Sequence, residues 1–126
     1  METGALRLLV IHPDAAVGEA LSQPLHSFAG HSEWCQEGVE GIRRCYQQWY
    51  DVVLVARWLR DMDAFELMEK VRLRDQKLTF IILVEAVTEA MTRQARGIGR
   101  CKLCSLAAGS RALEALLEEM LQKGSR

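Results

Sequence analysis

Five times along its 126 residues, this chain places a short apolar run before a stretch of helical period. Such an alternation is typical of parallel strands joined by crossover helices, because each helix carries the chain back across one face of the sheet. Strands are predicted over residues 6–11, 32–36, 51–56, 78–84 and 100–104. The pattern predicts an α/β fold built on a doubly wound, five-stranded parallel sheet.

The five runs differ in how continuously apolar they are. Residues 6–11 are apolar apart from Arg7, and residues 51–56 and 78–84 are close to continuously apolar. Strands that are covered by helices on both faces have this composition. Residues 32–36 form the weakest strand signal, which is typical of an edge strand.

The first three helices are predicted from apolar residues that recur three and four positions apart. The first follows Asp14, an N-cap residue, and contains Pro24, which should kink or shorten it. The second begins after Gly38. The apolar stripe of the first helix is expected at Val17, Leu21, Leu25 and Phe28. That of the second helix is expected at Val39, Ile42 and Tyr46, and that of the third at Phe65, Met68 and Val71.

The last two helices contrast in their apolar content. Residues 88–96 have helix formers but few apolar anchors, so we expect a poorly buried helix that Gly97 and Gly99 end. The final helix is the most regular, with Ser110 as its N-cap and Gly124 as its C-cap. Its apolar positions are Leu113, Leu116, Leu117, Met120 and Leu121.

Composition excludes several classes of partner. The chain has 16 Lys and Arg against 17 Asp and Glu, a net charge of −1, which does not favour nucleic acid or an anionic membrane. No run approaches the roughly 18 apolar residues of a membrane span, and the N-terminus lacks a signal-peptide pattern. Four cysteines in a leaderless chain are expected to be reduced thiols. We expect one cytoplasmic domain over residues 1–126, with its core at about 6–122, that contacts neither nucleic acid nor a membrane.

Candidate functional residues are expected where the strands end. In a doubly wound sheet, ligands bind at the carboxyl ends of the strands. The residues at these ends are His12, Ala56, Glu85 and Cys104. We therefore expect them to lie at one edge of the sheet.

Residues 50–67, YDVVLVARWLRDMDAFEL, resemble the third strand, site loop and third helix of response regulator receiver domains. The resemblance extends over about residues 6–122. It implies the flavodoxin-like (βα)5 receiver fold with strand order 2-1-3-4-5. Ala56 then occupies the position of the phosphorylated aspartate, while Arg60 and Ala64 occupy those of the loop proline and glycine.

The other strand ends depart from the receiver pattern in the same way. In the segment Val10 to Asp14, His12 and Pro13 occupy the positions of the acidic pair that holds magnesium. Glu85 replaces the small hydroxyl residue, and Cys104 and Ser105 replace the Lys-Pro pair. Cys101 occupies the position of the aromatic switch residue. The resemblance therefore implies a pseudo-receiver, which is neither phosphorylated at the usual site nor an enzyme, needs no cofactor, and acts in two-component-type signalling through protein contacts.

The remodelled site leaves an alternative open, namely a ligand, metal or redox sensor. Its residues are His12, Pro13, Asp14, Ala56, Arg57, Glu85 and Cys104. His12, Glu85 and Cys104 could together bind zinc. Cys101 and Cys104 have the spacing of a redox pair, but residues three apart in a strand point to opposite faces. Asp61 and Asp63 are expected to form exposed ion pairs with Arg57 and Arg60.

The expected partner is a protein, either a signalling protein or a fused output domain. Positive charge gathers around the fourth helix and fifth strand at Arg93, Arg96, Arg100 and Lys102, the face with which receivers dimerise and signal. One form of this hypothesis is that the chain forms a homodimer through the face from the fourth to the fifth helix. Another is that the chain is the N-terminal piece of a longer transcription regulator. Trp58, in the site loop, is expected either to cover the vacated pocket or to meet a partner.

Overall fold

The computed structural model describes residues 6–25, 29–105 and 110–123. Its sheet is parallel throughout and has the order β2-β1-β3-β4-β5, which confirms the predicted fold and strand order. β2 is an edge strand, as its polar sequence indicated. The strands are β1 (Leu6–Ile11), β2 (Ala29–Cys35), β3 (Val52–Ala56), β4 (Thr79–Val84) and β5 (Cys101–Ser105).

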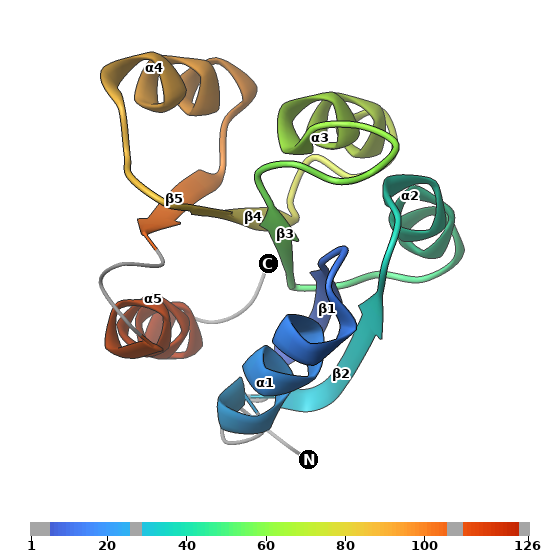
Figure 1. Cartoon of the computed structure of the whole chain (residues 1–126), viewed down its shortest axis with the longest axis vertical. Helices are drawn as coiled ribbons and strands as arrows, with labels where there is room; N and C mark the ends of the chain where they lie inside the picture. The colour runs from blue at the N-terminus through green and yellow to red at the C-terminus, as the bar shows by residue number, and fades with distance from the viewer. Residues whose placement is uncertain (1–5, 26–28, 106–109, 124–126) are drawn as a thin grey trace.

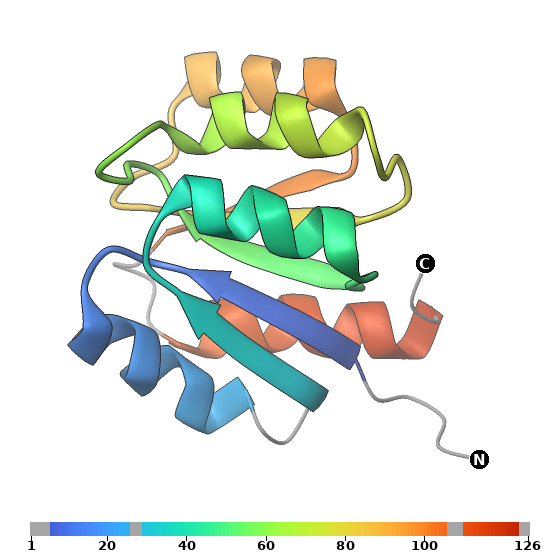
Figure 2. The same ribbon diagram turned by 90° about the vertical axis from the view of Figure 1, so that its right-hand side faces the viewer.

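Five helices cover the sheet in two layers. Figures 1 and 2 show α2, α3 and α4 on one face and α1 and α5 on the other. The helices are α1 (Ala15–Leu25), α2 (Gly38–Gln47), α3 (Ala64–Arg72), α4 (Glu89–Ile98) and α5 (Ser110–Lys123). None of them, over the ranges just given, is both long and apolar enough to cross a bilayer.

The core lies on both faces of β3, whose five residues are all buried. Val53 and Val55 belong to the cluster beneath α2, α3 and α4, and Val52 and Leu54 belong to the cluster against α1 and α5. The predicted α5 stripe is confirmed, because all five of its residues belong to or pack against the cluster beneath α1 and α5. Leu113 and Leu117 are buried there, and the others are Leu116, Met120 and Leu121. The α3 stripe of Phe65, Met68 and Val71 is confirmed as well.

The predicted stripe on α2 is wrong at two of its three positions, and the third, Ile42, packs against the first core cluster. Val39 is 61% exposed and Tyr46 is 44% exposed, and the buried positions of the helix are Gly38, Gly41 and Cys45. A Cβ atom at Gly41 would lie 2.3 Å from Ile11 Cδ1, so the missing side chain lets α2 approach β1. A search for apolar side chains cannot detect a helix face that packs through glycine.

Helix boundaries differ from the prediction at two places. Gly97 does not end α4 but lies inside it, and the C-cap is Gly99, whose φ of 86° favours glycine. α4 is poorly buried as expected, with Ala95 as its buried residue. α1 ends at Leu25, one residue after Pro24. The expected stripe residue Phe28 and the C-cap Gly124 lie outside the described residues.

Truncating a side chain in the core should cost far more stability than the same truncation on the surface. Leu54 is fully buried at the centre of the sheet, whereas Leu73 is 84% exposed. Leu54→Ala is expected to lower the free energy of unfolding by about 2–5 kcal/mol. Leu73→Ala should change it by less than about 0.5 kcal/mol. Urea titration followed by tryptophan fluorescence measures both values, and equal losses would contradict the packing described above.

Candidate functional site at the carboxyl edge of the sheet

The four predicted residues, His12, Ala56, Glu85 and Cys104, come from the ends of neighbouring strands. Ile11, which precedes His12, is paired with Val55, and Ala56 is paired with Leu83 in the next strand. Leu83 is in turn paired with Cys104. The topology therefore brings the ends of β1, β3, β4 and β5 to one edge.

Shared location at this edge does not produce a metal site. Glu85 is exposed, and its backbone oxygen accepts a hydrogen bond of 2.9 Å from the Ser105 hydroxyl. Cys104 is buried in the cluster with Leu113 and Leu117. No group of three His, Cys, Asp or Glu side chains able to hold a metal ion occurs among the described residues. The zinc hypothesis for His12, Glu85 and Cys104 is therefore wrong.

The loop from β1 to α1 is held by polar contacts with the end of β2. The His12 carbonyl accepts from the Trp34 indole at 3.2 Å, and the Pro13 carbonyl accepts from the Gln36 amide at 2.8 Å. Burial lowers the pKa of His12, and the charge of Asp14 opposes that shift. His12 Nδ1 accepts from the Asp14 backbone N–H at 3.1 Å. The imidazole thus supports the loop as a neutral acceptor.

Asp14 caps α1 as predicted. Its Oδ1 atom accepts from the Ala16 backbone N–H at 2.9 Å and, more weakly, from the Val17 backbone N–H at 3.4 Å. This use of the carboxylate satisfies amides that the first helical turn leaves without partners. The Asp14 side chain therefore has a structural role.

Trp34 joins α1 to the edge strand, a role that the sequence did not indicate. A Cβ atom at Gly18 would lie 2.4 Å from Trp34 Cδ1, so the indole occupies the space beside that glycine. A glycine four residues into a helix was the available signal, since it allows close approach of another group.

Arg57 is the most unusual residue of the loop from β3 to α3. Its guanidinium lies between two aromatic rings, 4.0 Å from the centroid of Trp58 and 4.8 Å from that of Phe65. Nη1 is 3.8 Å from Asp63 Oδ1. The Nε and Nη1 atoms are buried without a hydrogen-bond partner among the described residues. The two rings, through cation–π attraction, replace the usual polar partners.

Trp58 covers Arg57 with one face of its indole. The residue is nevertheless 65% exposed. Trp58 therefore shields the guanidinium and keeps apolar surface exposed at the site edge, while its contact with a partner stays a prediction.

The expected ion pairs of Asp61 are wrong. Its carboxylate caps α2, accepting from the Gly38 and Val39 backbone N–H groups at 2.9 Å each. Burial raises the pKa of Asp61, but these hydrogen bonds outweigh burial and the net pKa is lowered. Asp63 caps α3 by accepting from the Glu66 N–H at 2.9 Å. Both aspartates therefore fix helix ends, and Asp61 does so in a helix that lies 23 positions away in sequence.

The thiols do not form a redox pair. All four cysteines are free, and Cys101 and Cys104 pack in different core clusters, as alternation along a strand predicts. Burial raises the pKa of Cys101 to about 11 and also raises the pKa of Cys104. Burial likewise raises the pKa of Cys35 and of Cys45 to about 12. Protonated thiols are poor nucleophiles and poor metal ligands.

The basic residues predicted at the fourth helix and fifth strand are all exposed. They are Arg93, Arg96, Arg100 and Lys102. Beside them is a hollow of about 260 Å³ between α4 and β5, lined by Val87, Thr92, Ala95, Arg96, Cys101 and Leu103. Most of these lining residues are apolar, and Arg96 is the charged one.

A polar network around Glu33 holds the edge strand to α2, and the sequence did not indicate it. The Glu33 carboxylate accepts from the Arg44 guanidinium at 2.6 Å and from the Tyr50 hydroxyl at 2.7 Å, and it also contacts His31. Burial raises the pKa of Glu33, but hydrogen bonds from His31, Tyr50 and Arg44 outweigh it and lower the pKa to about 2.

Comparison with known proteins identifies the fold. The sequence matches no protein-family model and no curated protein. A CheY-like receiver domain protein from Methanospirillum hungatei JF-1 aligns with a TM-score of 0.75 at 18% identity, over 95% of this chain and 99% of its own. A LuxR-family two-component response regulator from Aurantimonas sp. SI85-9A1 gives 0.85 at 15% identity, over 96% and 88%. A two-component response regulator from Clostridium difficile aligns with a TM-score of 0.81 at 19% identity, over 96% of this chain and 97% of its own.

These likenesses cover nearly the whole chain at low sequence identity. The chain therefore has the receiver fold of two-component response regulators, as the resemblance implied.

The Glu33 network should make stability depend on pH in a defined direction. The folded pKa of about 2 lies below the ordinary 4.5, so the stabilisation is complete above pH 4.5 and is lost as the pH falls toward 2. Glu33→Gln is expected to cost about 1–3 kcal/mol at pH 7 and progressively less at lower pH. Urea titrations from pH 7 to pH 3 test this. Glu118→Gln, at an exposed site on α5, is the control. A Glu33→Gln cost that does not change with pH would contradict the assignment.

Proposed function

We propose that this chain is a receiver-like signalling module that works without aspartyl phosphorylation, is not an enzyme, and acts in the cytoplasm through protein contacts. The observation that carries the proposal is Ala56 at the end of β3. In the receiver fold, this is the position of the phosphorylated aspartate. A methyl group offers no nucleophilic oxygen, so no acyl phosphate can form there.

The residues around Ala56 support the same conclusion. Magnesium requires oxygen ligands, which the imidazole of His12 and the ring of Pro13 do not supply. The carboxylate of Asp14 is engaged at the start of α1. A Cys104 thiol with a raised pKa carries no positive charge to pair with a phosphoryl group. The substitution Ala56→Asp alone would therefore not restore phosphorylation.

The route of signalling is proposed to be the basic face formed by Arg93, Arg96, Arg100 and Lys102. The hollow between α4 and β5 adds an apolar floor to that face. Apolar contacts surrounded by charge are the usual composition of a protein interface. The partner is thus expected to present an acidic rim around an apolar side chain, on a signalling protein, on a fused output domain or on a second copy of this chain.

The absence of phosphorylation can be tested directly by intact mass. The protein is incubated with acetyl phosphate and magnesium chloride, beside a receiver domain that has aspartate at the end of its third strand. We expect no added mass on this chain and a phosphate adduct on the control protein, because only the control protein has a carboxylate nucleophile. An acid-labile adduct on this chain would refute the proposal.

The signalling face can be tested by charge reversal at two exposed arginines. Arg96 lines the α4–β5 hollow, whereas Arg43 lies on the exposed side of α2. Arg96→Glu is expected to reduce partner capture from the source cell about tenfold, because like charges across an interface repel. Arg43→Glu should leave capture unchanged. Quantitative pull-down with tagged protein compares them, and sedimentation of the same variants tests homodimerisation. Equal effects of the two variants would remove the assignment of this face.

A further inference from the structure

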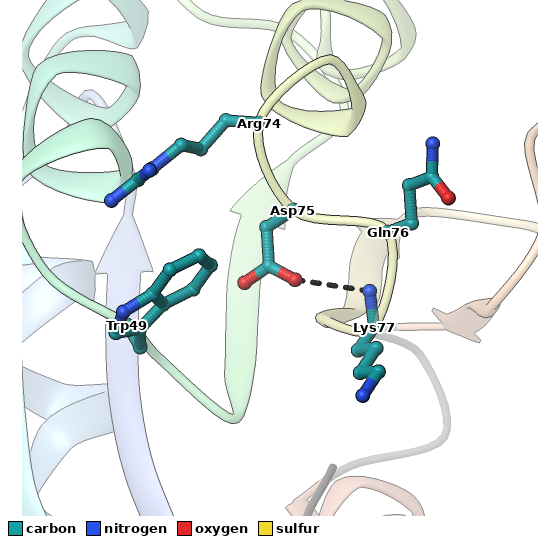
Figure 3. A pocket seen from close by; sticks show the side chains of 5 residues that line it. All are labelled: Trp49, Arg74, Asp75, Gln76 and Lys77. Carbon is teal, nitrogen blue, oxygen red and sulfur yellow. Dashed lines mark hydrogen bonds between the residues drawn. The ribbon is translucent and has the colours of Figure 1, made fainter.

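A second hollow lies at the opposite edge of the sheet, where the strands begin. It has a volume of about 670 Å³ and is lined by Trp49, Arg74, Asp75, Gln76 and Lys77. Figure 3 shows these side chains on the loop from α2 to β3 and on the loop from α3 to β4. The hollow is separate from the carboxyl edge and from the basic face of α4.

The two loops of the hollow are held by hydrogen bonds between side chains and backbone groups. The buried Asp75 carboxylate accepts from the Lys77 N–H at 3.0 Å and from the Leu78 N–H at 3.2 Å. The Trp49 carbonyl accepts from the Arg7 side chain at 3.1 Å, which holds the loop from α2 to β3. A site whose backbone is already fixed loses little conformational entropy when it binds.

Trp49 is the aromatic residue of the hollow. It is 48% exposed, and the Arg74 guanidinium lies 4.3 Å from its ring centroid. Tyr46, three positions before Trp49, and Leu73, next to Arg74, are exposed as well. The Tyr46 hydroxyl donates to the Lys70 carbonyl at 3.1 Å, which links α2 to α3. Trp, Tyr and Arg are the residues most enriched among those that dominate protein interfaces.

The exposed charges of the two loops that line the hollow have one sign. The loops at residues 48–51 and 73–78 expose Arg74 and Lys77. Their acids, Asp51 and Asp75, are buried and accept backbone hydrogen bonds. Within the described parts of the chain, the side chains of Arg74 and Lys77 form no ion pair. Two exposed cations beside an aromatic ring match a ligand that carries carboxylates.

We infer that this hollow, defined by Trp49, Arg74 and Lys77, is a second docking site, for an acidic segment of a protein partner. An apolar side chain of the segment packs on Trp49, and flanking carboxylates pair with Arg74 and Lys77. A peptide segment is the inferred occupant because the exposed Trp49 ring suits an apolar side chain and the two cations suit carboxylates on either side of it. The inference does not rest on the proposed function, since it uses a different edge of the molecule.

The test uses a peptide that alternates glutamate with leucine and phenylalanine, and a counterpart with lysine in place of glutamate. The indole N–H signals of Trp34, Trp49 and Trp58 report on three separate regions of the ¹⁵N-labelled protein. The acidic peptide is expected to shift the Trp49 indole and the amides of residues 74–77 in a saturable, salt-sensitive manner. The lysine peptide should not shift them.

Variants are compared through the shift of the Trp49 indole, which reports on this hollow. Arg74→Glu with Lys77→Glu is expected to weaken binding of the acidic peptide there at least tenfold. Arg43→Glu with Arg60→Glu, at two exposed positions outside the hollow, carries the same change of charge and should leave that binding unchanged. Any of four results would overturn the inference: no shift at millimolar peptide, equal shifts from both peptides, tighter binding of ADP or inorganic phosphate at Trp49, or the same shifts on raising the protein concentration alone. The last would indicate a second copy of this chain.

Discussion

The burial of β3 on both faces is the constraint on which the rest of the structure depends. All five residues of this strand are buried, and β1 and β4 pair with its two sides. A strand with no exposed face needs a layer of helices above and below it, and parallel neighbours require crossover connections. The five helices meet both needs. Because every strand runs the same way, the carboxyl ends of β1, β3, β4 and β5 lie at one edge, where receiver domains have their site.

At that edge, the polar groups hold the loops to the scaffold. Asp14 and Asp63 cap the helices that follow them, and Asp61 caps a helix from another part of the chain. The His12 carbonyl accepts from Trp34, and Arg57 is enclosed by two rings. These contacts stabilise the shape of a receiver edge, while Ala56 and the uncharged Cys104 thiol provide none of the groups for phosphoryl chemistry.

The exposed apolar and cationic groups that we propose as docking sites lie elsewhere, on two surfaces at different places in the fold. One is the basic face of α4 and β5 with its apolar hollow, and the other is the hollow around Trp49 at the amino edge. Both combine apolar surface with cations, which accords with protein partners that present carboxylates. The near-neutral total charge of the chain does not reveal these local concentrations of positive charge.

The sequence by itself determined the fold class, the five strands and the burial of α5, because these depend on the spacing of apolar residues along the chain. It also placed Asp14 at the start of α1, since a cap acts within three residues. Only the tertiary structure decided the packing of α2 through glycines, the cap that Asp61 provides from 23 positions away, and the Glu33 network. These contacts join residues that the crossover connections bring together, and no local pattern records which distant residues will meet.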